Sequence, residues 1–364
     1  MKVVLVYDRV NKIGGAERVL EVFHEMFPDA PLYTAVYNKV TAPWADSFDV
    51  RTTFLQHIPF AKTNHEYLPW LAPLAFETLD FSEFDLVISI TSEYAKGIIT
   101  KPGTTHVCYC LTPTRYLWSG YGEYFKDKVL QELARPVVWY LKTWDRVAGQ
   151  RPDRYVAISK TIQARVKKYY GRDSDVIYPP VTLNPKQVPD TKYKIPDTKY
   201  YLLVSRLVPY KRIDIAIEAA NKLGLSLKIV GSGRESAKLK AMAGPTIEFL
   251  GNLTDGQVKS YYQNCTALIM PSEEDFGLAV LEAQSFGKPV IAFKGGGGLE
   301  TIIEGKTGVF FFPQKAEALM KILQNFDPSE FSPKDCQEQA AKFGKEKFKK
   351  EFRLMIKKVM EEKL

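Results

Sequence analysis

Two glutamates lie eight residues apart in the segment MPSEEDFGLAVLEAQSFGKPVIAFKGGGGLE, residues 270–300. Glu274 precedes a predicted helix and Glu282 lies in its second turn, so the pair brackets the helix N-terminus at Gly277. A helix N-terminus offers unpaired N–H groups and a positive dipole end, and glycine lets an anion approach the main chain closely. The pattern favours a ligand whose phosphates bind the N–H groups of Gly277 and Leu278 and whose hydroxyls bind the glutamates.

A nucleotide sugar has this shape, with its ribose on Glu282 and its sugar on Glu274. The alternative is an acidic helix cap beside a solvated glutamate. The Phe276-Gly277 pair between the glutamates and the four glycines at 295–298 weigh against that alternative, because both permit close approach to the main chain.

The elements around these residues predict a β–loop–α–β–loop unit. The apolar run 267–270 predicts a buried strand, residues 278–286 a helix ended by Gly287, and residues 290–293 a second strand. In open parallel sheets, ligands bind outside the carboxyl ends of the strands, where both loops of this unit lie.

Two cations follow another predicted strand, at residues 200–205. Arg206 and Lys211 stand between this strand and a helix that begins near Ile213. They can neutralise a diphosphate, the arginine through its planar fork and the lysine as a point charge. The alternative is a solvated basic loop.

These motifs resemble the retaining glycosyltransferases of family 4. The resemblance lies in Glu274-x7-Glu282 around Phe-Gly-Leu, in the glycine loop that ends at Glu300, and in the run from Ser205 to Lys211 (SRL-x-P-x-K). It implies an α/β protein of the GT-B fold, with two Rossmann-like domains facing across a cleft. It also implies that the second domain binds the nucleotide-sugar donor and the first the acceptor.

The resemblance assigns roles to particular residues. It implies catalytic roles for Glu274, Arg206 and Lys211. It implies that donor binding involves Gly14, Gly15, Arg206, Lys211, Gly231, Leu253, Phe276, Gly277, Leu278 and Glu282. No DxD motif lies among these residues, so no metal is expected and the cations take its place.

The segment HVCYCLTPTRYLW, residues 106–118, is similar to the lipopolysaccharide-type mannosyltransferases of family 4. The resemblance favours GDP-mannose as donor and a glycan or lipid-linked acceptor in cell-surface polysaccharide synthesis. Leu111 stands where that family has a histidine that contacts the transferred sugar, and leucine cannot donate this hydrogen bond. A protein that binds nucleotide sugars with weak or lost transferase activity is therefore an alternative. His106 is expected to be structural.

The domain organisation follows from length and composition. A chain of 364 residues, 45% hydrophobic and 25% charged, predicts two globular domains. A proline-rich linker at 179–199 divides them into residues 1–180 and 181–344. The resemblance to the GT-B fold implies that a terminal helix at about 345–364 packs back on the first domain. The Gly14–Gly15 turn lacks the GxGxxG fingerprint and its acid, which disfavours a dinucleotide oxidoreductase.

The net charge of +8 suggests an anionic partner. Residues 115–172 hold 13 Lys/Arg against 5 Asp/Glu, and residues 342–364 hold 9 against 4. Aromatic residues interleave with basic ones over 116–151, and residues 57–76 are rich in aromatic residues and proline. We expect residues 116–151 to meet an anionic membrane surface. For residues 57–76, either packing within the protein or contact with a membrane stays open. A basic membrane or RNA binder is the alternative, although no nucleic acid is expected.

The four cysteines show no metal-ligand spacing and are expected to pack in the core. The N-terminus predicts a strand rather than a signal peptide, and no apolar run is long enough for a membrane helix. We therefore expect a cytoplasmic protein, peripheral on the inner face of the cell membrane where it meets lipid.

Overall fold

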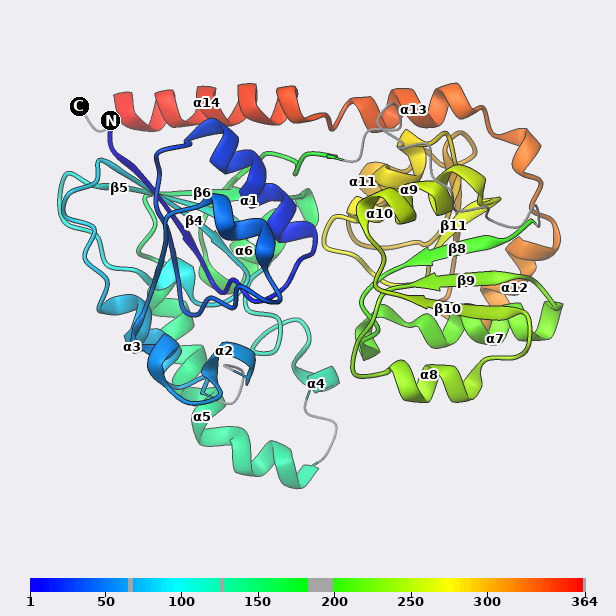
Figure 1. Cartoon of the computed structure of the whole chain (residues 1–364), viewed down its shortest axis with the longest axis horizontal. Coiled ribbons are helices and arrows are strands. Elements are labelled where there is room, and N and C mark those ends of the chain that lie inside the picture. The colour runs from blue at the N-terminus through cyan, green and yellow to red at the C-terminus, as the bar shows by residue number, and fades with distance from the viewer. Residues whose placement is uncertain (65–67, 125–127, 183–198, 363–364) are drawn as a thin grey trace. The chain divides into compact units, whose positions relative to one another are not determined.

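The computed structural model describes residues 1–64, 68–124, 128–182 and 199–362, so the linker expected at 179–199 lies mostly outside the described residues. The chain forms two compact units, Met1–Pro179 with Phe348–Leu364, and Pro180–Lys347. Each unit is a parallel sheet flanked by helices (Figure 1). The donor and acceptor roles expected for the two domains stay predictions.

Unit 1 has a seven-stranded parallel sheet in the order β3-β2-β1-β4-β5-β6-β7. Its strands are β1 (Val3–Tyr7), β2 (Leu32–Thr34), β3 (Val50–Thr52), β4 (Leu86–Thr91), β5 (Thr105–Cys110), β6 (Arg154–Ala157) and β7 (Asp175–Val176). Because β2 and β3 extend from one side of β1 and β4 from the other, a topological switch point lies between β1 and β4.

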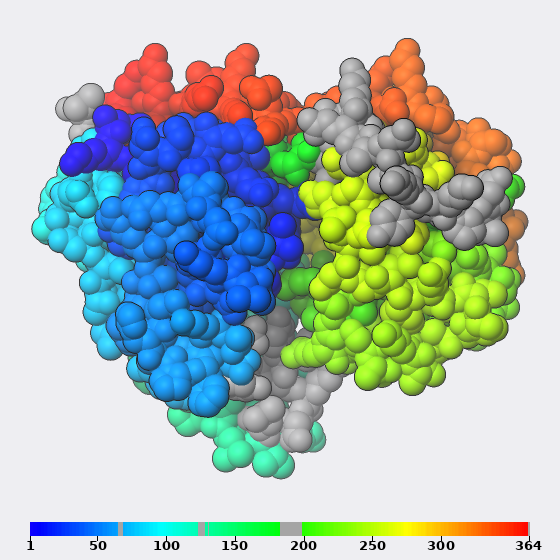
Figure 2. Space-filling model, in the orientation of Figure 1, coloured from blue at the N-terminus to red at the C-terminus, as the bar shows by residue number. Residues whose placement is uncertain are grey.

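Helices cover this sheet and complete its core. They are α1 (Gly15–Met26), α2 (Ala61–Asn64), α3 (Ala72–Glu77), α4 (Tyr121–Tyr124), α5 (Lys128–Ala148), α6 (Lys160–Tyr170) and α14 (Lys345–Glu361), with short 3-10 turns η1 (Pro43–Ser47), η2 (Phe54–His57) and η4 (Ala95–Gly97). On α14, Phe348 and Phe352 pack edge-on against Phe23 of α1, with ring centroids 5.4 and 4.7 Å away. Figure 2 shows α14 in red at the surface beside the blue N-terminal segments.

Unit 2 has a six-stranded parallel sheet in the order β10-β9-β8-β11-β12-β13. Its strands are β8 (Tyr201–Val204), β9 (Leu227–Val230), β10 (Ile247–Gly251), β11 (Ala267–Met270), β12 (Val290–Phe293) and β13 (Gly308–Phe311). Its helices are η6 (Pro209–Lys211), α7 (Ile213–Leu223), α8 (Ser236–Met242), α9 (Asp255–Asn264), α10 (Leu278–Ser285), α11 (Gly298–Thr301), α12 (Ala316–Gln324), η7 (Pro328–Glu330) and α13 (Pro333–Ala341). The switch point of this sheet lies between β8 and β11.

Alternation along the strands of unit 2 places side chains in two separate apolar clusters. Leu203 and Ile269 lie in one cluster, while their neighbours Leu202 and Leu268 lie in the other. Both faces of the sheet are therefore buried, as parallel sheets require, and this explains the near-continuous apolar runs in the sequence.

Several expectations about packing are settled. All four cysteines are buried and free, which confirms core packing. In the segment 57–76, Ala61 and Phe76 are buried, whereas Phe60 and Trp70 are exposed, so the segment both packs and presents apolar surface. No helix in the described ranges combines the length and apolar character needed to span a bilayer.

Candidate functional site

Two loops of unit 2 meet at its switch point. The loop after β8 carries Arg206 and Lys211, and the loop after β11 carries Glu274. Because β8 and β11 are neighbours in the sheet, their carboxyl ends bring together residues that are 63 positions apart in the chain. The sequence predicted both loops as site loops but did not predict that their charged residues contact each other.

Lys211 and Glu274 form a largely buried ion pair. The Lys211 Nζ lies 2.6 Å from Glu274 Oε1, and the side chains are 13% and 16% exposed. The Ser272 hydroxyl donates to the same carboxylate oxygen at 2.5 Å. Burial alone would raise the pKa of Glu274, but the Lys211 charge and the bonds from Lys211 and Ser272 outweigh it and lower that pKa. Glu274 is therefore a carboxylate at neutral pH.

The N-terminus of α10 lies next to this pair in the chain. Gly277 caps the helix with a positive φ of +93°, a conformation that glycine adopts without strain. The first-turn N–H groups and the positive dipole end belong to the same loop as Glu274. This loop therefore combines one carboxylate with donors that suit an anion.

The glycine run after β12 packs against the loop that carries Glu274. The N–H of Gly297 donates to the Glu274 carbonyl at 2.8 Å, and Gly296 pairs with Glu274 as an isolated β-bridge. A Cβ atom at Gly296 would lie 2.2 Å from the Glu274 carbonyl oxygen, and one at Gly297 would lie 2.4 Å from Phe276 Cα. These glycines allow the main chain to hold the Glu274 loop from behind.

Arg206 is the exposed cation of the site. Its Nη2 donates to the Tyr210 hydroxyl, and the Tyr210 ring lies 5.9 Å from the Arg206 guanidinium and 5.4 Å from Lys211 Nζ. No carboxylate of the described residues forms an ion pair with Arg206, in contrast to Lys211. Arg206 therefore carries the uncompensated positive charge that an anion would meet.

Glu282 and Phe276 lie deeper than the sequence suggested. Glu282 is buried on α10, and one carboxylate oxygen accepts a hydrogen bond from the Tyr262 hydroxyl at 2.8 Å. The Phe276 ring is buried edge-on against Phe343, at 5.7 Å. Any contact of Phe276 with a ligand would have to come from its main chain.

Gly231 and Leu253 follow β9 and β10 at the same edge of the sheet. Gly231 has φ +124°, and a Cβ atom there would lie 2.0 Å from the Ser205 carbonyl oxygen, so this glycine packs against the loop that carries Arg206. Leu253 is half-buried and precedes Thr254, which caps α9 through a capping box.

The remaining predicted residues belong to unit 1. Gly14 caps α1 in an extended conformation and Gly15 begins that helix, directly after the loop that follows β1. Leu111 follows β5, and its N–H donates to the Thr91 carbonyl at 2.8 Å. His106 is buried in β5 with Nε2 2.8 Å from the Ser89 hydroxyl, consistent with a structural role.

Sequence reasoning missed the supporting residues. Ser272 could have been found, since it precedes Glu274 by two residues in a predicted loop. Tyr262 carries no such signal, because only the fold brings α9 to α10. In the described ranges, no cluster of three or more His, Cys, Asp or Glu side chains is placed to hold a metal ion.

The chain is similar to one protein family and to several known proteins. Residues 187–343 match the protein family described as Glycosyl transferases group 1. Over 216 residues the chain is 27% identical to the D-rhamnosyltransferase WbpZ of Pseudomonas aeruginosa, with 56% of each protein covered. Over 213 residues it is 28% identical to O-antigen chain mannosyltransferase C of Escherichia coli, with 54% of this chain and 55% of that protein covered. The matches thus span about half the length of these curated relatives.

The fold of this chain is similar to that of a protein of known structure. The Anabaena protein HepE, crystallised in complex with UDP, matches with a TM-score of 0.71 at 18% identity, over 98% of this chain and 100% of that chain. This likeness, with the two parallel sheets, confirms the predicted GT-B fold of two Rossmann-like domains.

Proposed function

We propose that this chain is a retaining glycosyltransferase that moves a hexose from a nucleotide sugar to a glycan or lipid-linked acceptor. The observation that carries the proposal is the Lys211–Glu274 pair at the switch point, in which Glu274 shares its loop with the α10 N-terminus. The family match over residues 187–343 and the similarity to sugar transferases support it.

In this proposal the donor diphosphate lies between Arg206 and the first turn of α10. Breaking the bond between sugar C1 and the diphosphate oxygen leaves negative charge on the diphosphate and positive charge on the sugar. Arg206 and the N–H groups stabilise the former, and Lys211 adds a second cation. Glu274 lies on the sugar side, where its carboxylate binds hydroxyls and stabilises the cationic centre.

Retention follows if the acceptor attacks the face that the diphosphate leaves. The acceptor oxygen then forms the new bond to C1, and its proton passes to the leaving phosphate oxygen. No side chain is required as a covalent nucleophile. No metal is required either, since Arg206, Lys211 and the N–H groups supply the positive charge.

The favoured donor is GDP-mannose, which the similarity to an O-antigen chain mannosyltransferase supports. The crystal structure of HepE with UDP makes a uridine donor the competing choice. A thermal-shift panel of GDP, UDP, ADP and their sugars separates these, because a ligand of the native state raises Tm. We expect GDP and GDP-mannose to give the largest shifts; a larger shift with another base would replace GDP-mannose.

Leu111 supports one alternative function, in which the protein binds nucleotide sugars without transferring the sugar. The Leu111 side chain follows β5 and cannot donate a hydrogen bond to a sugar. Donor binding without turnover on any acceptor would favour this alternative. A gain in turnover or a change of donor preference in Leu111→His would show that the position contacts the transferred sugar.

We further propose that α5 rests on an anionic membrane. Leu133 and Trp139 are 73% and 71% exposed on this helix, which also carries the cations Lys142 and Arg146. Burial and the nearby Arg146 both lower the pKa of Lys142, so an anionic headgroup would relieve a repulsion. Exposed apolar residues beside cations are typical of helices that lie in a membrane interface.

Vesicle sedimentation tests the membrane proposal. Leu133→Gln combined with Trp139→Gln should weaken binding to phosphatidylglycerol vesicles severalfold, whereas Val40→Gln, at a residue 88% exposed elsewhere on unit 1, should not. The proposal would be contradicted if the double variant bound these vesicles as tightly as Val40→Gln does. It would also be contradicted if the wild type bound neutral phosphatidylcholine vesicles as tightly as phosphatidylglycerol vesicles.

A further inference from the structure

Unit 1 carries a charged pair at the same topological position as the pair in unit 2. In each unit the first and fourth strands flank the switch point. Arg9 follows β1 and Glu93 follows β4, as Lys211 follows β8 and Glu274 follows β11. Arg9 Nη1 lies 2.7 Å from Glu93 Oε1, and the side chains are 11% and 19% exposed, close to the values for the pair in unit 2.

We propose that Arg9 and Glu93 bind hydroxyl groups of the acceptor sugar in unit 1. This inference rests on the proposed glycosyltransferase function. In open α/β sheets, the crevice outside the carboxyl ends of the strands at the switch point is where ligands bind. Arg9 and Glu93 are each the second residue after a strand that borders this crevice.

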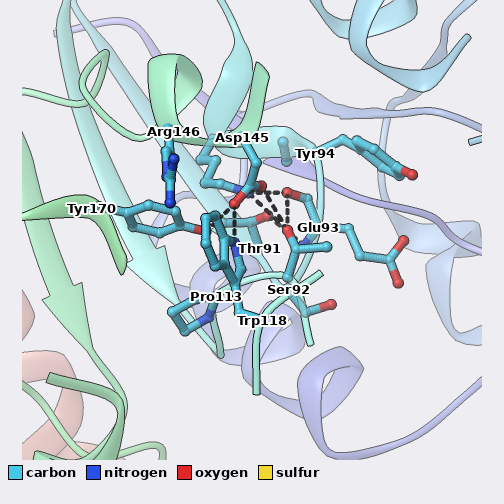
Figure 3. A network of polar contacts seen from close by, with 12 residues as sticks. Thr91, Ser92, Glu93, Tyr94, Pro113, Trp118, Asp145, Arg146 and Tyr170 are labelled. Atoms are coloured by element: carbon cyan, nitrogen blue, oxygen red, sulfur yellow. Dashed lines mark hydrogen bonds and ion pairs between the residues drawn. The ribbon is translucent and has the colours of Figure 1, made fainter. Parts of the chain in front are cut away.

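The main chain under Glu93 is held by a buried carboxylate. Asp8 accepts hydrogen bonds from the N–H groups of Ser92 (2.6 Å), Glu93 (3.0 Å), Tyr94 (2.9 Å) and Ala95 (2.9 Å) and from the Thr91 hydroxyl (2.9 Å). Figure 3 shows the Glu93 side chain pointing away from these bonds. The loop is therefore fixed while the Glu93 carboxylate is left to act at the edge of the sheet.

A second buried carboxylate holds the same loop from the other side. The Lys96 Nζ donates to the Glu93 carbonyl and forms an ion pair with Asp145 at 2.6 Å, with both side chains 1% exposed. Trp118 and Tyr170 point toward Asp145 and donate to it at 2.7 and 2.8 Å (Figure 3). Buried ionic networks of this kind keep one geometry, because breaking them leaves a buried charge without a partner.

The hydrogen-bonding capacity of the pair suits a neutral polyhydroxyl ligand. The Arg9 Nε–H is buried and has no hydrogen-bond partner in the described part of the chain, and Nη1 meets Glu93 as an ion pair without an aligned hydrogen bond. Burial opposes the charge of Arg9, but Glu93 outweighs it and raises the pKa of Arg9. A sugar hydroxyl can accept from the guanidinium while it or its neighbour donates to Glu93.

The balance of charge excludes a different class of ligand. Because Glu93 neutralises Arg9, the pair as a whole offers no net positive charge to a phosphate or carboxylate, whereas unit 2 adds Arg206, with which no carboxylate of the described residues forms an ion pair. A sugar diol places one hydroxyl on each partner and loses no ion pair on binding. We therefore assign neutral sugar hydroxyls, rather than an anionic group, to this position.

Saturation-transfer NMR with methyl glycosides of mannose, glucose and galactose tests the assignment. The wild type should bind at least one of them, and Glu93→Gln should weaken that binding at least about tenfold, as expected for a lost charged hydrogen bond. Glu83→Gln is the control, since Glu83 is 58% exposed and its carboxylate lies 3.9 Å from Lys2 Nζ. Arg9→Lys, which keeps the charge but loses the fork, should also weaken binding and serves if Glu93→Gln does not fold.

Thermal shift with nucleotides, run on the same proteins, separates this inference from the proposed function. We expect Glu93→Gln to keep the nucleotide-induced rise in Tm, since Glu93 is not among the residues assigned to the donor and the charged groups proposed to hold the diphosphate belong to unit 2. Unchanged glycoside binding with a lowered Tm would make the pair purely structural and overturn the inference, as would a wild type that binds none of the glycosides. A wild type whose Tm no nucleotide raises would instead overturn the proposed function.

Discussion

At the residue scale, the account depends on an ion pair whose two members have different tasks. Lys211 and Glu274 neutralise each other in the structure, yet in the proposed reaction one faces a diphosphate and the other a sugar. The pair keeps both groups charged and in place before the donor arrives. Pre-positioned charges of this kind stabilise a transition state without reorganising during the reaction.

Removing the lysine should therefore damage the chemical step. Lys211→Ala is expected to lower kcat/KM for transfer by roughly 10²-fold or more, because the negative charge that develops on the leaving diphosphate is then stabilised by one cation fewer. Steady-state kinetics with Lys222→Ala as control checks this, since Lys222 is an exposed lysine of unit 2 that pairs with Glu218 on the same helix. Turnover equal to the control would remove Lys211 from the mechanism.

The same pair predicts a pH effect. The folded-state pKa of Glu274 is depressed, so the stability it contributes is present above the unfolded pKa and is lost as pH falls through the folded pKa. In Lys211→Met the lysine charge is gone while burial, which raises the pKa, remains. The acid limb of the activity–pH profile should move to higher pH, and an unmoved limb would show that Glu274 is not the titrating group.

At the element scale, glycines allow one loop to support another. Gly296 and Gly297 let the segment after β12 touch the segment that carries Glu274, and this contact explains two of the four consecutive glycines. The sequence indicated a glycine loop near a ligand but not that its partner is another loop. Only the short main-chain distances between this segment and the Glu274 segment show that these glycines support a neighbouring loop.

A matched pair of variants separates strain from contact. Gly296→Ala and Gly305→Ala both place a side chain at positive φ, +62° and +75°, but only the former brings a Cβ atom to 2.2 Å from the Glu274 carbonyl. We expect Gly296→Ala to destabilise the protein by about 1–3 kcal/mol more than Gly305→Ala, as overpacking does. Denaturant unfolding measures both; equal losses would mean that the loop contact contributes nothing.

Local signals predicted the elements well where caps mark their ends. The helix predicted at 278–286 is observed as Leu278–Ser285, with Gly277 at φ +93° before its start and Gly287 at φ +73° just after its end. The segment 116–151 packs only in part, because on α5 Leu141 is buried while Tyr140 is 42% exposed. Periodicity of 3.6 residues finds a face of a helix, and the neighbouring elements decide how wide the buried part is.

The contacts that shape the site were beyond local reasoning. Lys211 meets Glu274 across 63 residues, and Thr91 meets Asp8 across 83. Both contacts arise from the order of strands in a sheet, which the sequence of one chain does not state. Motif spacing located Glu274 and Arg206, whereas strand order decided which charges pair.

At the scale of the whole molecule, the terminal helix ties the end of the chain to its beginning. Phe348 and Phe352 of α14 are buried against Phe23 and Tyr109, so unit 1 is complete only with residues from the C-terminus. The sequence expectation that this helix returns to the first domain came from the resemblance alone. The packing of these rings gives it a physical cause.

This packing should dominate the stability of unit 1. Phe352→Ala is expected to cost about 3–5 kcal/mol, as other core Phe→Ala changes do. Leu354→Ala on the same helix is the control, because Leu354 is 58% exposed. Equal free energies of unfolding for the two variants would show that α14 does not complete the core.

Isothermal titration of a nucleoside diphosphate and of its nucleotide sugar separates the proposed diphosphate contacts from the proposed sugar contact of Glu274. Glu274→Gln is expected to bind the diphosphate as tightly as the wild type does, because Arg206 and the α10 N-terminus remain. This variant is also expected to lose the additional affinity that the sugar confers. A Glu274→Gln variant that binds both ligands like the wild type, or a wild type that binds neither, would contradict the account.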